Sequence, residues 1–170
     1  MQMKEKIFLW TLLLIGSALI FFLFSGRSEQ GSEGNAMTKE AKSAEEAKWK
    51  AELTPEQYAI LREKDTERPF SSPLNDEKRP GTYYSVDTKE AVFRSEDKFD
   101  SGTGWPSFTR PIKSEAVIET EDSHFGFKRT EILSTAGGHL GHVFTDGPAP
   151  TGLRYCMNGA ALYFVPDEPK

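Results

Sequence analysis

The chain opens with a long apolar run. Residues 7–24, IFLWTLLLIGSALIFFLF, form eighteen consecutive positions without a charged side chain. About 20 apolar residues cross the hydrocarbon core of a bilayer, whereas the apolar part of a cleaved signal peptide holds ~7–15 and ends at a small-residue cleavage site. No good Ala-x-Ala site follows this run. The pattern therefore predicts one transmembrane helix, with residues 1–24 as an uncleaved N-terminal membrane anchor.

The charges on either side of the apolar run predict its orientation. Lys4, Lys6 and the terminal amine precede the run, whereas Arg27 follows it in the company of Glu29 and Glu33. Positive residues favour the cytoplasmic side of a membrane. We therefore expect a single-pass protein whose N-terminus is cytoplasmic and whose folded domain is extracytoplasmic.

A polar segment separates the anchor from the folded domain. Residues 25–37 are rich in Gly and Ser, which predicts a flexible tether. Residues 41–53, AKSAEEAKWKAEL, are rich in helix formers. We interpret residues 25–48 as a tether and helical linker.

A second, shorter helix is predicted directly after this linker. Thr54 can cap its N-terminus, Pro55 fits the first helical position, and Gln57 completes a capping box. The apolar positions that follow extend the helix to about Lys64.

From Pro69 onward the pattern changes to short stretches that often alternate apolar and polar positions. These stretches are rich in β-branched and aromatic residues, and Pro, Gly and Ser separate them. They are TYYSV, AVFRS, AVIET, FGFKRTEIL, HVF and ALYFV. We expect residues 49–170 to form one domain of mainly β, mostly antiparallel structure, with short helices at its N-terminal edge.

Composition excludes several classes of function. The chain has 21 Lys and Arg against 26 Asp and Glu, a net charge of −5, and no basic run, so we expect no nucleic-acid partner. Its single cysteine, Cys156, allows neither an internal disulfide nor a Cys-based zinc site. A lone cysteine is usually a small buried hydrophobe. If Cys156 is instead redox-active, a thiol from another molecule must complete its cycle.

The neighbours of Cys156 are compatible with a reactive thiol. In a strand, Arg154, Cys156 and Asn158 would share one face, and a nearby cation lowers the pKa of a thiol. The alternative is a strand whose Arg and Asn are simply solvated, and spacing alone does not separate the two. Trp105, in the turn-like segment GTGWPSF, is either a core aromatic or a flat seat for a methyl group beside sulfur.

Two histidines form the other candidate cluster. His139 and His142 stand three residues apart in HLGHVF, and the third histidine, His124, lies in an unrelated stretch. Metal binding would need a carboxylate such as Asp146 as a further ligand. Acid–base or hydrogen-bonding work is the better interpretation, because histidine titrates near neutral pH. A purely structural role for one of the two remains open.

Taken together, these segments resemble the B-type methionine-(R)-sulfoxide reductases. The resemblance runs from about Trp49 to Pro166 and rests on GTGWPSF, HLGHVFTDGP and GLRYCMNGAALYF in that order, preceded by TERPFSSPLN. It implies two antiparallel sheets with short helices. It also implies thiol-dependent reduction of methionine-(R)-sulfoxide, either free or in oxidised proteins under repair, with no cofactor besides an external thiol.

The resemblance also assigns roles to individual residues. It implies that Cys156 is the nucleophile, that Trp105 forms an aromatic wall for the substrate methyl group, and that the histidine pair bonds and protonates the sulfoxide oxygen. Phe108, in the same segment as Trp105, is predicted to contact substrate as well. The residues implied to orient this network and support the thiolate are Asp146, Arg154 and Asn158.

Departures from the family pattern sharpen the prediction. Many members bind a structural zinc through two Cys-x-x-Cys pairs, and the corresponding positions here are Ser85 with Thr88 and Ser134 with Gly137. We therefore expect no zinc. The segment from Ser134 to His139 also looks one residue shorter than usual. Two-cysteine members often place the recycling cysteine where this chain has Thr103.

The resemblance predicts a sulfenic acid on Cys156 after each turnover, which an external thiol, from a thioredoxin-like protein or another donor, reduces. Two other classes of function are compatible with part of this pattern. One is a non-catalytic binding module of the same fold tethered to the membrane, which would lack the nucleophile or its acids. The other is a metal-dependent hydrolase that uses HLGH, which metal analysis of the protein would detect.

Overall fold

A computed structural model describes residues 30–123 and 128–169, which belong to two units, residues 1–48 and 49–170. The predicted membrane span at residues 7–24 lies outside the described residues. Within the described ranges, no helix combines the length and apolar character needed to cross a bilayer.

Helix α2, Gln30–Glu52, confirms the predicted helical linker but begins earlier than expected. Residues 30–37 were predicted to be part of a flexible tether, and the structure places them in the helix. This correction has a simple cause: once the strong helix formers that follow have nucleated a helix, each further turn costs little. At the other end, Trp49 and Leu53 are buried in the core of residues 49–170.

Helix α3, Pro55–Glu63, confirms the predicted capping box. The Thr54 hydroxyl accepts a hydrogen bond from the Gln57 amide at 3.2 Å, and the Gln57 side chain accepts one from the Thr54 amide at 3.0 Å. Ile60 and Leu61 are the buried residues of this helix. Lys64 ends it in the left-handed conformation, with φ of 62°.

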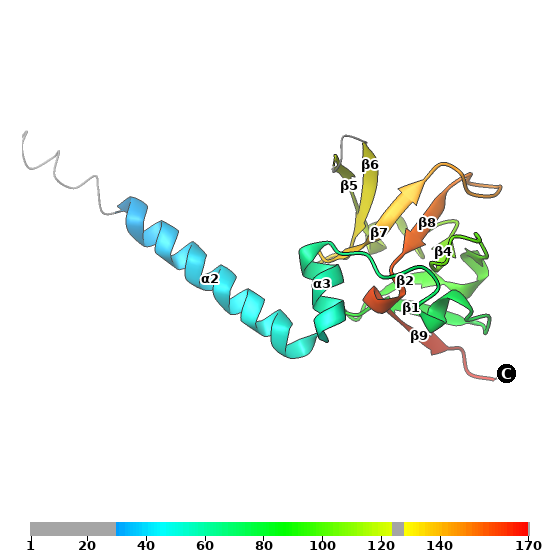
Figure 1. Cartoon of the computed structure of the whole chain (residues 1–170), viewed down its shortest axis with the longest axis horizontal. Helices are drawn as coiled ribbons and strands as arrows, with labels where there is room; N and C mark the ends of the chain where they lie inside the picture. The colour runs from blue at the N-terminus through cyan, green and yellow to red at the C-terminus, as the bar shows by residue number, and fades with distance from the viewer. Residues whose placement is uncertain (1–29, 124–127, 170) are drawn as a thin grey trace, which may run out of the picture. The chain divides into compact units, whose positions relative to one another are not determined.

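The rest of the domain consists of two antiparallel sheets, as predicted (Figure 1). The smaller sheet has the order β2-β1-β9 and the larger the order β3-β4-β8-β7-β6-β5. The strands are β1 Gly81–Ser85, β2 Ala91–Arg94, β3 Lys98–Phe99, β4 Ser107–Phe108, β5 Ile118–Asp122, β6 Arg129–Leu133, β7 His139–Phe144, β8 Arg154–Met157 and β9 Leu162–Pro166. Short 3-10 turns connect several of them: η1 Pro73–Asn75, η2 Ser95–Asp97, η3 Ser114–Ala116 and η5 Gly159–Ala161.

An aromatic cluster joins the two sheets. Phe108 of β4 stacks on Phe93 of β2, with ring centroids 4.4 Å apart, and meets Tyr83 of β1 edge-on at 4.9 Å. All three side chains are fully buried. Such aromatic pairs contribute about 0.5–1.5 kcal/mol beyond the burial of their surface. The cluster fixes β4, and with it the neighbouring strand β8.

The centre of the larger sheet brings distant parts of the chain together. In the antiparallel pairings, Cys156 of β8 lies opposite Ser107 of β4 on one side and opposite His142 of β7 on the other. Gly141 makes the close approach of β7 and β8 possible, because a Cβ there would lie 2.1 Å from the Cys156 carbonyl oxygen. Sheet pairing therefore places the only thiol beside an imidazole.

Candidate active site

A small cavity opens over the centre of the larger sheet. Its volume is about 180 Å³, and the thiol of Cys156 is part of its wall. The residues that line it are Thr66, Trp105, Arg129, Gly141, His142, Phe144, Cys156 and Asn158. Two larger clefts, of about 850 and 650 Å³, are lined by neither the thiol nor an imidazole. Of these three cavities, the small one is therefore the one that contains both a thiol and an imidazole.

Cys156 is partly buried, and this burial dominates its acidity. Burial raises the pKa of the thiol, while the hydroxyl of Thr103, with its oxygen 3.9 Å from the sulfur, and the positive charge of Arg154 act in the opposite direction. The sequence led us to expect a thiolate supported by Arg154. Arg154 does favour the thiolate, but burial outweighs it, so the resting group is the thiol at neutral pH.

This balance predicts the pH dependence of Cys156 reactivity. Because only the thiolate is alkylated, the rate with iodoacetamide should rise with pH and reach half its maximum above the ordinary thiol pKa. Arg154→Met should move this midpoint higher still, since it removes a positive charge that stabilises the thiolate. Arg110→Met, which removes an exposed guanidinium paired with Asp97, is the matched control and should not move it. A wild-type midpoint below the ordinary thiol pKa would contradict this account.

Trp105 lines the cavity, and its indole is fixed from behind. The indole Nε1 donates a hydrogen bond to the carbonyl oxygen of Glu67 at 3.1 Å. Glu67 is itself buried, and its carboxylate accepts hydrogen bonds from the amides of Gly159 and Ala160 at 2.7 and 2.8 Å. Burial raises the pKa of this carboxyl, although the two amides oppose the shift. The aromatic wall is thus attached to the turn that follows Cys156.

Phe108 lies elsewhere, although the sequence placed it with Trp105 as a residue that contacts substrate. It is 0% exposed, belongs to the aromatic cluster between the sheets, and is not among the residues that line the cavity. On β4, Ser107 faces Cys156 across the pairing, whereas Phe108 faces Tyr155. Alternation along the strand therefore directs Phe108 into the core.

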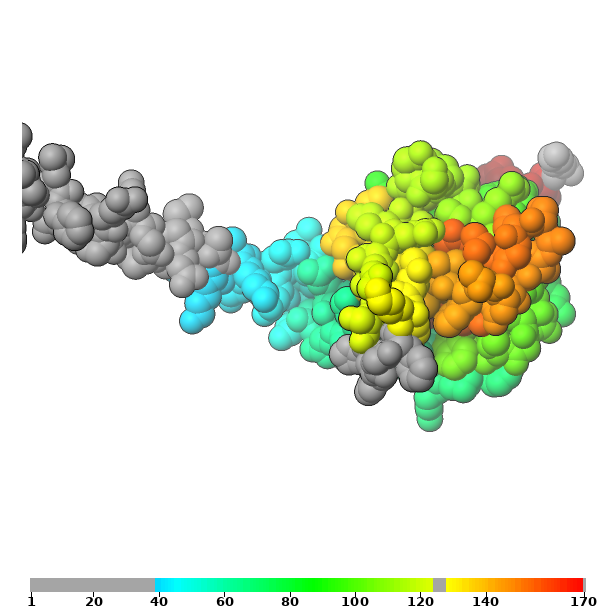
Figure 2. Space-filling model, turned by 90° about the horizontal axis from the view of Figure 1, so that it is seen from above, coloured from blue at the N-terminus to red at the C-terminus, as the bar shows by residue number. Residues whose placement is uncertain are grey.

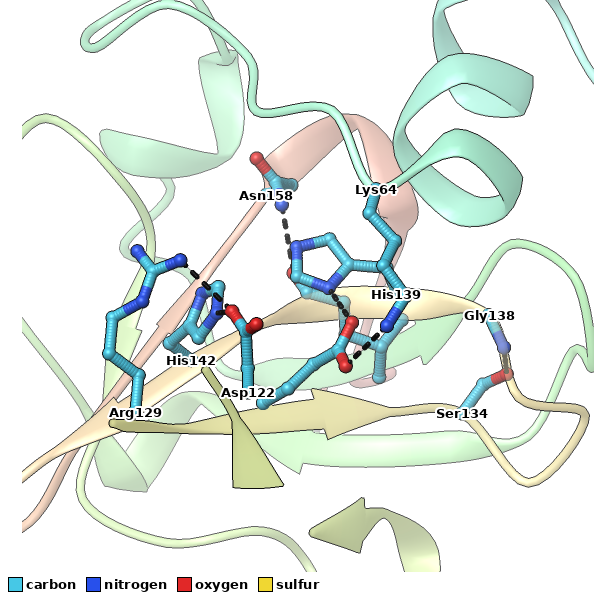
Figure 3. Close-up of polar contacts among 10 residues, drawn as sticks. Lys64, Asp122, Arg129, Ser134, Gly138, His139, His142 and Asn158 are labelled. Carbon is cyan, nitrogen blue, oxygen red and sulfur yellow. Dashed lines mark hydrogen bonds and ion pairs between the residues drawn. The ribbon is translucent and has the colours of Figure 1, made fainter. Parts of the chain in front are cut away.

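The two histidines lie together, with ring centroids 5.2 Å apart (Figure 3). His142 lines the cavity, and its Nε2 is 3.0 Å from Oδ2 of Asp122. His139 is 2% exposed, and its Nδ1 is 2.7 Å from Oε1 of Glu131. Burial lowers the pKa of His139, although the carboxylate of Glu131 opposes the shift. His142 is therefore the imidazole that a bound molecule meets, and His139 lies behind it.

Of the residues Arg154, Asp146 and Asn158, which the sequence predicted to support the site, only Asn158 lines the cavity. The guanidinium of Arg154 makes two hydrogen bonds of 2.9 Å to the carboxylate of Asp146 and lies 4.4 Å from the Phe144 ring centroid. Asn158 is buried; its amide nitrogen donates to the Leu140 carbonyl at 3.2 Å, and its oxygen accepts from the Glu67 amide at 3.1 Å. Asp146 thus reaches the site only through Arg154.

Sequence reasoning missed several residues that complete the site. They are Thr66, Arg129 and Phe144 in the cavity wall, and Glu67, Asp122 and Glu131 behind it. One signal was present: Glu131 interrupts an otherwise strand-like stretch, and the structure shows it only 2% exposed. A buried carboxylate needs a partner, which marks such a position as worth testing.

The resemblance implies that many relatives bind zinc through two pairs of cysteines. The residues at the corresponding positions of this chain do not fit a metal. Ser85 and Ser134 are fully buried, and both hydroxyls donate to the carboxylate of Asp87, that of Ser134 at 2.6 Å. The Ser134 hydroxyl also accepts a hydrogen bond from the Gly138 amide at 3.0 Å (Figure 3). In the described part of the chain, no group of three His, Cys, Asp or Glu side chains is arranged to hold a metal.

Asp87 therefore links the loop after β1 to the loop before β7 by hydrogen bonds. Asp87→Asn would place an amide group where two buried hydroxyls need an acceptor, and we expect a loss of about 1–3 kcal/mol in the free energy of unfolding. Urea unfolding measures the loss, with the exposed Asp76→Asn as the matched control. Unchanged stability, or protein that carries stoichiometric zinc and unfolds with a chelator, would refute this reading of the cluster.

A thiol and an imidazole that line one small cavity, with an aromatic wall, are the components of an enzyme with a cysteine nucleophile. The comparisons make this specific. The SelR domain family matches residues 53–166. Peptide methionine sulfoxide reductase MsrB of Agrobacterium fabrum is 53% identical over 71% of this chain and 90% of its own length. The enzymes of the same name from Pseudomonas putida and Leptospira interrogans are 53% and 55% identical, over 78% and 68% of this chain and 98% and 89% of theirs.

These matches cover the segment that contains the whole cavity. The chain therefore belongs to the SelR domain family, that of the MsrB peptide methionine sulfoxide reductases, as its motifs predicted.

Proposed function

We propose that this chain reduces methionine sulfoxide to methionine in oxidised peptides and proteins, with Cys156 as the nucleophile and an external thiol as the reductant. The observation that carries the proposal is the pairing of Cys156 with His142 across β8 and β7, in a cavity walled by Trp105, in a member of the MsrB family. The non-catalytic binding module has no support, because this site keeps a thiol, an imidazole and an aromatic wall.

The chemistry follows from the polarity of the sulfoxide. Its sulfur is electrophilic, but oxide is a poor leaving group, so the oxygen must be protonated as the S–O bond breaks. The sulfur of Cys156 attacks, and the proton of its thiol passes through the histidine pair to the sulfoxide oxygen. Over the whole step, the methionine sulfur gains two electrons, Cys156 loses two, and the oxygen ends on the cysteine as sulfenic acid.

The cavity is suited to a small, mainly apolar group. Trp105 and Phe144 supply aromatic walls, and methyl and sulfur groups pack well on aromatic rings. Asn158 forms hydrogen bonds with the backbone near the nucleophile, and Arg154 places a positive charge near the sulfur. Asp146 fixes Arg154 by two hydrogen bonds. Preference for the R epimer of the sulfoxide follows from family membership and is part of the proposal.

Recycling of Cys156 requires a second molecule. Thr103 lies near the sulfur but offers a hydroxyl, which is a far weaker nucleophile than a thiolate at neutral pH. A donor thiol attacks the sulfenic acid, which releases water and leaves a mixed disulfide; a second thiol then restores Cys156 and takes the disulfide away. A thioredoxin-like protein or a small dithiol can supply both thiols. No metal takes part in this scheme.

The activity is tested with separated R and S epimers of a methionine sulfoxide peptide and dithiothreitol as the donor. We expect methionine to form from the R epimer, and from the S epimer at a much lower rate. Equal rates would refute the stereochemical part, and no product from either epimer would refute the function.

We propose in addition that residues 7–24 anchor the protein, that residues 25–48 link the anchor to the reductase domain of residues 49–170, and that this domain lies outside the cytoplasm. The support is the uncharged apolar run and the positive charges that precede it. The protein should stay in the membrane fraction through a high-salt wash, whereas a chain that begins at residue 30 should not. Protease added to intact cells should release the domain; cleavage only after the membrane is broken would contradict the orientation.

A further inference from the structure

Each histidine of the site is backed by its own carboxylate, and both carboxylates come from the β5–β6 hairpin. Glu131 of β6 contacts His139, and Asp122 at the end of β5 contacts His142. In the larger sheet the hairpin is next to β7, and Figure 2 shows its yellow segment on the same face of the molecule as the orange segment that leads to β8. The hairpin is thus next to the reactive strands, although none of the family motifs quoted from the sequence lies in it.

The carboxylate of Glu131 is paired with a cation. It is 2% exposed, and a buried carboxylate stays ionised only when it is paired and hydrogen-bonded. Oε2 lies 2.7 Å from the ammonium of Lys64, the residue that ends α3, and Oε1 lies 2.7 Å from Nδ1 of His139. An ionised carboxylate can only accept hydrogen bonds, so Nδ1 of His139 carries the proton.

Asp122 has the same arrangement on the other histidine. It lies opposite Arg129 in the β5–β6 pairing, and its Oδ2 accepts a hydrogen bond of 2.9 Å from the guanidinium of Arg129. The same oxygen is 3.0 Å from Nε2 of His142. By the same reasoning, Nε2 of His142 carries the proton. The two rings are therefore held in opposite tautomers, and Figure 3 shows the carboxylate that lies beside each ring.

We propose that Glu131 and Asp122 are positioning residues that set these opposite tautomers and stabilise the imidazolium form of each ring. The proposal deepens the proposed function and rests on it. With its Nε2–H bonded to Asp122, His142 keeps a lone pair on Nδ1. That nitrogen takes the proton of the Cys156 thiol as the sulfur attacks, and the imidazolium then gives it to the sulfoxide oxygen. Glu131 and His139 support this charge from behind.

The direct test reads the tautomers without any substrate. The chain has only three histidines, so the imidazole nitrogens of ¹⁵N-labelled protein give a small set of NMR signals. We expect the Nδ1–H form for His139 and the Nε2–H form for His142. Glu131→Gln should mix the two forms of His139 and leave His142 unchanged, and Asp122→Asn should do the reverse. The same tautomer on both wild-type rings would overturn the proposal.

The kinetic test uses the same variants with dithiothreitol as donor. Each should lower kcat on the order of 10- to 10³-fold, less than loss of the imidazole itself, which contributes about 10²–10⁴-fold, and KM should change less than kcat. The matched control is Glu119→Gln, which removes a carboxylate on the same hairpin that instead bonds the Tyr155 hydroxyl at 2.8 Å, and it should keep wild-type kcat. Wild-type kcat in both Glu131→Gln and Asp122→Asn would overturn the proposal.

Two features keep this test decisive. If Glu131→Gln fails to fold, Asp122→Asn and the wild-type tautomers still test the proposal. Asp122 lies at the end of its strand and is less buried than Glu131, so its substitution should disturb the fold less. Failure of the proposed function itself would look different, since wild-type protein would then reduce no sulfoxide whatever its histidine tautomers.

Discussion

Cys156→Ser is expected to abolish reduction of the sulfoxide, with a fall of roughly 10⁴-fold or more in kcat/KM. The reason is chemical: a serine hydroxyl at neutral pH is almost entirely protonated, and no second cysteine exists in the chain to replace the thiol. The change should not disturb the fold, because it exchanges sulfur for oxygen at a partly exposed position in the middle of β8. Activity is measured by chromatographic detection of the methionine peptide with dithiothreitol as donor.

The control for this variant is structural. Its thermal unfolding midpoint and far-ultraviolet circular dichroism should match those of the wild type, and Cys156→Ala should be equally inactive. Retention of more than a few per cent of the activity in well-folded Cys156→Ser protein would mean that another group attacks the sulfoxide, which would contradict the proposed mechanism.

His142→Asn is expected to have the second largest effect. His142 is the imidazole in the cavity wall, and general acid–base catalysis by such a group contributes about 10²–10⁴-fold. An asparagine amide can still donate a hydrogen bond, but it cannot take up the thiol proton and pass it to the oxygen. We therefore expect kcat to fall by about 10²–10⁴-fold.

The His142 variant separates a chemical role from a packing role. His142→Gln restores much of the side-chain length and some hydrogen bonding to Asp122, so a packing role predicts substantial rescue, and an acid–base role predicts none. A kcat within about threefold of the wild type in both variants would contradict the role in proton transfer.

Local signals predicted much of the fold. The Thr54–Gln57 capping box determines the start of α3 through contacts between neighbours in the sequence, and alternation of apolar residues marks most strands of both sheets. The two-residue strands β3 and β4 were not predicted, because two residues are too few to show a period. Phe108 was assigned to the substrate for a related reason. Trp105, in the same segment, lines the cavity, but the direction of the Phe108 side chain depends on the pairing of β4 with β8.

The motifs predicted Cys156, His139 and His142 as site residues, but not the carboxylates that contact the two imidazoles. Glu131 is eight residues from His139 in the sequence, and Asp122 is twenty residues from His142. These contacts exist only because β5, β6 and β7 pair in a particular register. Register depends on the whole sheet, so no local pattern in the EDSHFGFKRTEIL stretch predicts it.

The acidity of Cys156 was also beyond the sequence. The presence of Arg154 two residues away suggested a lowered thiol pKa, and the charge does act in that direction. The opposing effect is burial, which depends on how Trp105, Phe144 and the strands enclose the sulfur. A sequence shows which charged residues are near Cys156 along the chain, but not how far the folded protein excludes water from its sulfur.

The central claim is that Cys156 alone takes the oxygen from the sulfoxide and that another molecule's thiol must restore it. It is tested most directly by mixing reduced protein with excess R-sulfoxide peptide in the absence of any thiol. We predict one methionine product per chain and then no further turnover. Mass spectrometry should show one added oxygen on Cys156 that dimedone captures, and dithiothreitol should restart the reaction. Continued turnover without a thiol, or a Cys156-linked dimer formed as fast as the product, would contradict the account.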